Sequence, residues 1–235
     1  MISAVAFCPQ PPLLVPALAS GAAGELAALR ASCSTAIASL AAPGRRVVVL
    51  GAGESTRSHS PLARGSLAGY GAPLEVTLGS PGCAGAVELP LALTVGAWLV
   101  QQTLGPSSGA VGFSIGRGAE HRPTAAELRA LADTDDVALL VMGDGAARRS
   151  PTAPGYFDPR SGPFDDTVLA ALAAGDAAAL AALDPLLGQA VLAAGVPAWR
   201  AAGRLLRGRS YQAEILYADD PYGVGYVVAG WCAHG

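Results

Sequence analysis

Short runs of apolar residues alternate along this chain with longer alanine-rich segments. Runs of about four to eight apolar residues are typical of strands buried within a sheet, whereas longer segments with apolar positions at helical spacing are typical of helices. The pattern predicts an α/β fold, with a mixed, mostly parallel central sheet and helices on both faces. The predicted strands are Ile2–Phe7, Arg45–Leu50, Pro73–Leu78, Gly109–Ile115, Val137–Met142 and a hairpin within Ser210–Trp231, and the predicted helices are Ala22–Leu40, Val87–Leu104, a segment that begins near Thr124, Phe164–Ala174, Ala177–Leu183 and Pro185–Leu206 with a break near Gly195.

The organisation of the chain indicates one domain over residues 1–235, because no internal repeat and no long linker interrupts it. Two segments, Ser55–Gly71 and Ser150–Pro163, are rich in loop-forming residues, and each follows the end of a predicted strand. Ligands of open α/β sheets bind at the carboxyl ends of the strands. We therefore expect these two loops to form the walls of a cleft.

Composition narrows the range of partners. Hydrophobic residues make up 51% of the chain and charged residues only 14%, so we expect a homo-oligomer in which apolar surface meets another subunit. The net charge of −3 and the lack of a basic cluster argue against a nucleic-acid partner. The chain has no lysine, which excludes Schiff-base lysine chemistry and the phosphate-loop lysine of common nucleotide hydrolases.

The cysteines and the N-terminal segment predict a cytoplasmic location. Cys8, Cys33, Cys83 and Cys232 form no Cys-x-x-Cys pair, so we expect buried thiols in a reducing compartment. No basic residue precedes Arg30, and a secretory signal needs a positive region. The longest strongly apolar stretch is too short to span a bilayer, so we expect no membrane partner.

One carboxylate, Glu214, interrupts the otherwise apolar strand that opens the terminal hairpin. Burying a carboxylate costs several kcal/mol unless a cation, a metal or a proton neutralises it. Glu214 is therefore expected either in a metal or substrate site or in a structural ion pair with an arginine.

Four separated segments resemble the B-subunit domain of class III extradiol ring-cleavage dioxygenases, the superfamily that also contains the Memo-like proteins. Their order and spacing cover almost the whole chain, and the last one is the most specific. The segments are Phe7–Pro16, Val49–Glu54, Met142–Arg149 with Tyr156–Arg160 after it, and Glu214–Tyr217 with Pro221–Tyr226.

The resemblance implies a non-haem Fe(II) site built from two histidines and one carboxylate, which binds a catecholate and dioxygen. Glu214 stands at the family's carboxylate ligand. The histidine of the family's Pro-His-Pro-Pro pattern is Gln10 here, and the second histidine position falls on Gly51–Gly53. A third histidine of the family is missing from Asp144–Arg148. We therefore expect an iron site that is not intact, and no cofactor.

Three histidines remain in the chain. His59 follows the second predicted strand between two serines, and it is interpreted either as a replacement metal ligand or as a solvated loop residue. His121 precedes Arg122-Pro123, and His234 is next to the last residue. Both are interpreted as residues without a functional role.

Polar residues at the strand ends suggest a cleft that binds a small, aromatic molecule through hydrogen bonds, without redox chemistry. The alternative is structural, with Asp144 and Arg148 paired to fix a loop and Tyr222 exposed in a turn. The chain has no Gly-x-Ser-x-Gly nucleophile elbow, and no catalytic residue is assigned. The expected cleft residues are Gln10, Ala52, Gly53, Glu54, Asp144, Arg148 and Tyr222.

Three functions follow from these observations. The first is an extradiol dioxygenase B-like protein without an intact Fe(II) site, acting as a small-molecule-binding or regulatory relative. The second is an active, ring-cleaving oxidoreductase whose Fe(II) or other divalent metal is held by Glu214, His59 and another group. The third is an oligomeric scaffold without a ligand.

Overall fold

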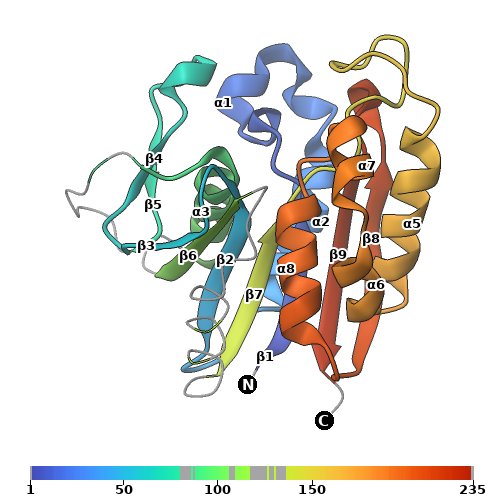
Figure 1. Cartoon of the computed structure of the whole chain (residues 1–235). Helices are drawn as coiled ribbons and strands as arrows, with labels where there is room; N and C mark the ends of the chain where they lie inside the picture. Colours follow the sequence, from blue (N-terminus) through green and yellow to red (C-terminus); the bar gives the residue numbers. More distant parts are fainter. Residues whose placement is uncertain are drawn as a thin grey trace.

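The structure, a computed structural model, describes residues 2–79, 86, 88–105, 109–116, 126, 130 and 136–233. A seven-stranded sheet with the order β3-β6-β2-β7-β1-β9-β8 forms its centre (Figure 1). The four inner strands β6, β2, β7 and β1 are parallel, whereas β3, β9 and β8 extend the sheet through antiparallel pairs. The strands are β1 (Ile2–Cys8), β2 (Arg46–Gly53), β3 (Arg57–His59), β6 (Ala110–Gly116), β7 (Val137–Met142), β8 (Tyr211–Asp219) and β9 (Tyr226–Ala233).

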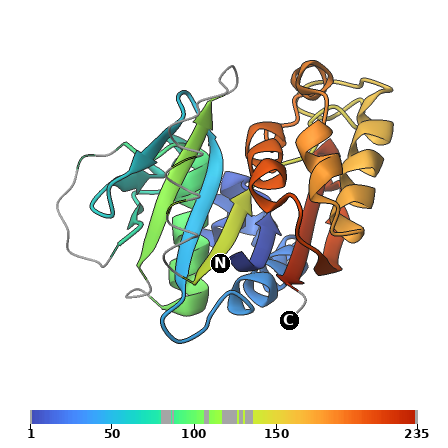
Figure 2. The same ribbon diagram turned by 60° about the horizontal axis from the view of Figure 1, so that its bottom comes forward.

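The inner strands are apolar on both faces because helices cover both sides of the sheet. All six residues of β7 are buried, as expected for a central parallel strand. On one face, α2 (Ala27–Ala38) and α3 (Leu91–Leu104) pack against the strands and form one hydrophobic core. On the other face the core is formed with four further helices, which lie in front of the sheet and at its right edge in Figure 1 and on the right in Figure 2. These helices are α5 (Ser161–Ala173), α6 (Ala177–Ala182), α7 (Pro185–Ala190) and α8 (Val196–Leu206).

The remaining elements are short. They connect the strands or extend the surface around the carboxyl ends of the sheet. They are η1 (Pro12–Leu14), α1 (Pro16–Ala19), η2 (Ser20–Gly24), the paired strands β4 (Arg64–Ser66) and β5 (Glu75–Thr77), η3 (Ala68–Tyr70) and η4 (Pro221–Gly223).

The predicted fold class is confirmed: the protein is α/β, with a mixed, mostly parallel sheet covered on both faces. Several boundaries differ from the prediction. The helix expected from Val87 begins at Leu91, because Pro90 is its N-cap with extended backbone angles (φ −64°, ψ 160°). The first predicted helix is divided, and its α-helical part begins only at Ala27. Of the helix expected near Thr124, the structure describes only Ala126 and Ala130, and both are helical.

Two further expectations need correction. The segment around His59 was expected to be a loop, but it forms the edge strand β3 opposite β6. Cys8 and Cys33 are buried thiols as expected, whereas Cys232 is exposed because it lies next to the end of β9. Cys83, His121 and His234 lie outside the described residues.

The packing of α3 on β2 depends on a glycine. A Cβ atom added at Gly51 would lie 2.5 Å from the Cβ of Ala92, which is closer than two carbon atoms can pack. A Cβ atom added at Gly230 in β9 would meet nothing within 4 Å. The two glycines both lie in strands, so they form a matched pair for testing this contact.

We predict that Gly51→Ala lowers the free energy of unfolding by about 1–3 kcal/mol, because overpacking forces α3 away from the sheet. Gly230→Ala leaves it unchanged or raises it slightly, because alanine restricts the unfolded chain. Urea denaturation followed by circular dichroism measures both. Equal effects of the two substitutions would contradict the close packing of β2 and α3.

Candidate functional site

The carboxyl ends of the parallel strands bring two predicted residues together. Gln10 follows β1 and Asp144 follows β7, and these strands are neighbours in register, with Cys8 opposite Met142. The backbone N–H of Gln10 donates a hydrogen bond of 2.7 Å to Oδ1 of Asp144. The backbone N–H of Gly143 donates to the carbonyl of Cys8 at 2.9 Å, which extends the pairing beyond the strands. Gln10 and Asp144 therefore form the centre of the candidate site.

The side-chain oxygen of Gln10 is a hydrogen-bond acceptor for which the described residues provide no donor. Gln10 is only 7% exposed, and its Oε1 atom is buried with no hydrogen-bond partner among the described residues. Most buried polar atoms in proteins have a partner, and leaving one unsatisfied costs about 1–3 kcal/mol. A donor from a bound molecule would satisfy this oxygen.

Burial raises the pKa of Asp144 to about 7, and the hydrogen bond from the Gln10 N–H only partly opposes this shift. Asp144 therefore exchanges a proton near neutral pH. Tyr226, the first residue of β9, lies close enough that the charge of Asp144 adds to burial in raising the pKa of the tyrosine. Tyr226 is a residue of the candidate site that sequence reasoning missed, although it ends the most specific segment of the family resemblance.

Two glycine-containing loops hold Asp144 and Tyr226 in place. The N–H of Gly145 donates to the carbonyl of Gly225 at 2.7 Å, and the N–H of Gly225 donates to the carbonyl of Ala146 at 3.0 Å. These bonds join the segment after β7 to the segment before β9. The positions of Asp144 and Tyr226 relative to each other follow from this short ladder.

The buried carboxylate of Asp165 supports the same two loops. It accepts a hydrogen bond of 2.9 Å from the N–H of Ala146, and it receives a second, charged bond of 3.1 Å from Arg149. The same guanidinium contacts Asp220 at 2.6 Å. Burial raises the pKa of Asp165, while the Ala146 N–H and Arg149 act in the opposite direction.

Tyr222 lies in the turn between β8 and β9, with a left-handed backbone (φ 63°) and partial exposure. Its hydroxyl group donates a hydrogen bond of 2.5 Å to Glu25, which lies just before α2. This bond is the main reason why the pKa of Tyr222 is raised. Tyr222 therefore connects the terminal hairpin to the segment that precedes α2.

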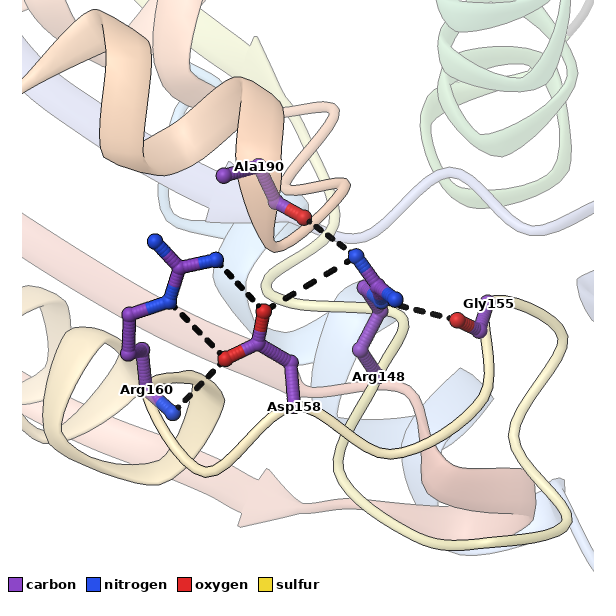
Figure 3. Close-up of polar contacts among 5 residues, drawn as sticks. All are labelled: Arg148, Gly155, Asp158, Arg160 and Ala190. Carbon is purple, nitrogen blue, oxygen red and sulfur yellow. Dashed lines mark hydrogen bonds and ion pairs between the residues drawn. The ribbon is translucent and has the colours of Figure 1, made fainter.

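Arg148 does not pair with Asp144. It donates hydrogen bonds to the carbonyls of Gly155 at 2.7 Å and Ala190 at 2.9 Å, and it lies 3.8 Å from a carboxylate oxygen of Asp158 (Figure 3). Asp158 in turn binds Arg160 through both carboxylate oxygens, at 3.0 and 2.7 Å. Arg160, followed by Arg148, holds the pKa of Asp158 well below its ordinary value. The geometry thus assigns Arg148 to a clamp that fastens the loop after β7 to the end of α7.

The end of β2 reaches the same edge of the sheet. Ala52 and Gly53 continue the pairing with β6, opposite Ile115 and Gly116. A Cβ atom at Gly53 would lie 2.7 Å from that of Ser114, so neither Gly51 nor Gly53 has room for an imidazole. Glu54 follows on the surface and is exposed.

His59 is buried, and its interpretation as a solvated residue is wrong. It is 4% exposed, and its Nε2 lies 2.9 Å from the hydroxyl oxygen of Ser114. Since that hydroxyl donates to the carbonyl of Ser55 at 2.8 Å, it accepts from Nε2–H. The Nδ1 atom then carries the lone pair, and it has no partner among the described residues. Burial, followed by the charge of Arg57, lowers the pKa of His59.

Glu214 is exposed, so the expectation of a buried carboxylate is wrong. It lies in the middle of the edge strand β8, opposite Gly230, which in turn lies opposite Ala6 of β1. His59 lies on the opposite edge strand, β3. Six strand spacings of about 4.8 Å place the two residues roughly 29 Å apart, so one metal ion cannot bind both.

The residues present do not fit the iron site that the family resemblance implies. An amide occupies the first histidine position, the two glycines at the second leave no space for a ring, and the carboxylate is exposed on an edge strand. In the part of the chain that the structure describes, no three His, Cys, Asp or Glu side chains gather where they could hold a metal ion.

Comparisons with known proteins support the fold alone. No protein-family model matches the chain, and no curated protein matches it. The crystal structure of the uncharacterized protein JW3007 from Escherichia coli K12 is similar, with a TM-score of 0.52 and 15% sequence identity over 98% of this chain and 99% of that one. Among the described helices, none has the length and apolarity needed to cross a membrane.

Asp144 makes the stability of the protein dependent on pH. Its folded-state pKa of about 7 lies above the ordinary value of 3.8. At any pH between these two values, Asp144 therefore binds a proton in the folded state and has released it in the unfolded state. The contribution of Asp144 to the free energy of unfolding is therefore present at low pH and is lost as the pH rises through about 7.

We predict that Asp144→Asn removes this dependence. Between about pH 5 and pH 8, the free energy of unfolding of the wild type should fall by on the order of 2 kcal/mol more than that of the variant. Urea denaturation at a series of pH values measures the difference. Asp166→Asn, at an exposed position of α5, is the matched control and should follow the wild type. Parallel curves for Asp144→Asn and the wild type would show that folding does not raise the pKa of Asp144.

Proposed function

We propose that this protein is a small-molecule-binding relative of the extradiol dioxygenase B-subunit superfamily that works without the iron chemistry of the family. The observation that carries the proposal is the buried, unpartnered Oε1 of Gln10 beside Asp144. These two groups occupy the edge of the sheet where α/β proteins bind ligands. A buried acceptor next to a titrating carboxyl group is a site for a molecule that brings its own hydrogen-bond donor.

The chemistry of the site favours a ligand with phenolic hydroxyl groups. Gln10 Oε1 can accept one hydroxyl hydrogen, and the ionised carboxylate of Asp144 can accept another. Because the pKa of Asp144 is about 7, ligand and carboxyl group can share a proton at neutral pH, which matches a binding or sensing role.

Three features support binding without iron: the amide at position 10, the close contacts at Gly51 and Gly53, and the separation of Glu214 from His59 across the sheet. A neutral amide oxygen is a weak ligand for Fe(II) compared with an imidazole. The proposed ligand is therefore bound by hydrogen bonds and is released unchanged.

We predict that anaerobic reconstitution with Fe(II) leaves far less than one iron per chain, because the ligand set is incomplete. Metal analysis after desalting measures this content. About one iron per chain, together with consumption of dioxygen and a ring-cleaved product from catechol, would replace this proposal with an active oxidoreductase.

We also predict that catechol binds and that its dimethyl ether, veratrole, does not, because only catechol brings hydroxyl donors. Gln10→Leu removes the acceptor and should weaken catechol binding by about tenfold, the equivalent of one or two hydrogen bonds. Titration followed by NMR measures binding. The control is Gln212→Leu, a matched change at an exposed position of β8.

The fold should tolerate Gln10→Leu, since removing an unsatisfied buried polar group is neutral or stabilising. Equal binding of catechol and veratrole, or no effect of Gln10→Leu in a variant that melts like the wild type, would contradict the role of Gln10. No binding of catechol would favour a scaffold without a ligand.

A further inference from the structure

The short strand β3 lies at the edge of the sheet beside β6 (Figure 1). It pairs with β6 over Arg57–His59, with His59 opposite Gly112. Arg57 and Ser58 are exposed, whereas His59 is only 4% exposed. Because three residues provide few backbone hydrogen bonds, the attachment of β3 to β6 depends strongly on the buried ring of His59.

A chain of hydrogen bonds fixes the orientation of this ring. Nε2 of His59 lies 2.9 Å from the hydroxyl oxygen of Ser114, which belongs to β6. That hydroxyl group donates its one hydrogen to the carbonyl of Ser55 at 2.8 Å. Nε2 therefore carries the ring hydrogen and donates it to Ser114. The lone pair of the ring is left on Nδ1.

Nδ1 is the atom that takes up a proton when the pH falls. It is buried, and no described residue offers it a hydrogen-bond partner. A proton added there creates a buried N–H donor without an acceptor, together with a buried positive charge. The attached position of β3 therefore suits the neutral ring and opposes the protonated ring.

Two charged side chains face the ring. Arg57 on β3 opposes a positive charge on His59, whereas Glu88, which lies shortly before α3, favours one. Arg57 and Glu88 lie 3.5 Å apart as an ion pair, so their effects on the ring partly cancel. From β6 the ring meets the uncharged hydroxyl group of Ser114. Burial, followed by Arg57, therefore lowers the pKa of His59 below its ordinary value of 6.5.

We propose that β3 is a pH-sensitive edge strand, which is attached to β6 while His59 is neutral and detaches when His59 takes up a proton. The two states differ in their affinity for one proton, so the pH shifts the balance between them. The inference rests on His59 and its neighbours and does not depend on the function proposed for Gln10 and Asp144.

The direction of the effect follows from the lowered pKa of His59. Below about pH 6.5 the detached strand binds a proton that the attached strand does not, so the attachment is complete above this pH and weakens as the pH falls. The contribution of Asp144 to stability changes in the opposite direction, because its folded-state pKa is raised. A weaker attachment of β3 in acid therefore cannot come from Asp144.

Amide hydrogen exchange of the full chain at pH 8 and pH 5, corrected for the intrinsic exchange rates, tests the proposal. Protection of the amides of β3 should be at least about threefold lower at pH 5. The upper limit is about thirtyfold, which is set by the 1.5 pH units, roughly, between pH 5 and the ordinary pKa of histidine. The amide of Gly116 is the internal control, because it donates to the hydroxyl group of Thr56 at 2.9 Å without involving the ring.

Three variants separate the ring from its surroundings. His59→Gln retains a side-chain N–H donor but takes up no proton, so the protection of β3 should be the same at both pH values. Arg57→Gln removes an exposed charge that opposes protonation, and it should reduce the effect of pH by about half or more. Arg207→Gln, an equal change at an exposed position just after α8, should behave like the wild type.

Nitrogen NMR of the imidazole rings gives an independent measurement, in which the signals of His59 are identified by their loss in His59→Gln. At pH 8 the ring hydrogen should be on Nε2. A hydrogen on Nδ1, or a protonated ring in a strand that is equally protected at pH 5 and pH 8, would overturn the proposal.

The exchange data contradict the proposal in two further cases. One is an undiminished effect of pH in His59→Gln. The other is an equal change in Arg57→Gln and Arg207→Gln, which would indicate an effect of overall charge. If His59→Gln does not fold, the comparison of Arg57→Gln with Arg207→Gln still decides, because both replace exposed side chains.

Discussion

The candidate site depends on the backbone ladder between the loop after β7 and the loop before β9. Gly145 and Gly225 approach so closely that a Cβ atom on either would collide with the carboxylate of Asp165. That carboxylate is in turn held by the Ala146 N–H and by Arg149. Because two glycines leave space for one buried acid, segments about eighty residues apart in the chain are joined at the carboxyl edge of the sheet.

The chemistry of the candidate site follows from this ladder. It holds Asp144 in a position where burial raises its pKa to about 7, and it brings Tyr226 beside the same carboxyl group. The glycines at 143 and 195 continue the close backbone contact towards the other face of the sheet.

The order of the strands explains why the iron site that the family resemblance implies does not fit. A metal site needs its ligands within a few ångströms of one ion. Here His59 and Glu214 lie on the two opposite edge strands of a seven-stranded sheet. Both are candidates by residue type, yet each has a local environment of its own: His59 binds Ser114, and Glu214 is exposed. Position in the sheet, rather than residue type, decides their role.

The sequence by itself determined the fold class and the centre of the site. Buried strands and alanine-rich helices have different apolar periods, and parallel strands end at one edge, which brings Gln10 and Asp144 together. Only the tertiary structure decided which strands form the edges, and hence that Glu214 is exposed and His59 is buried against a serine 55 residues away. The partners of Arg148 and the role of Tyr226 also depend on loops brought together by folding, because such contacts have no local signal in the chain.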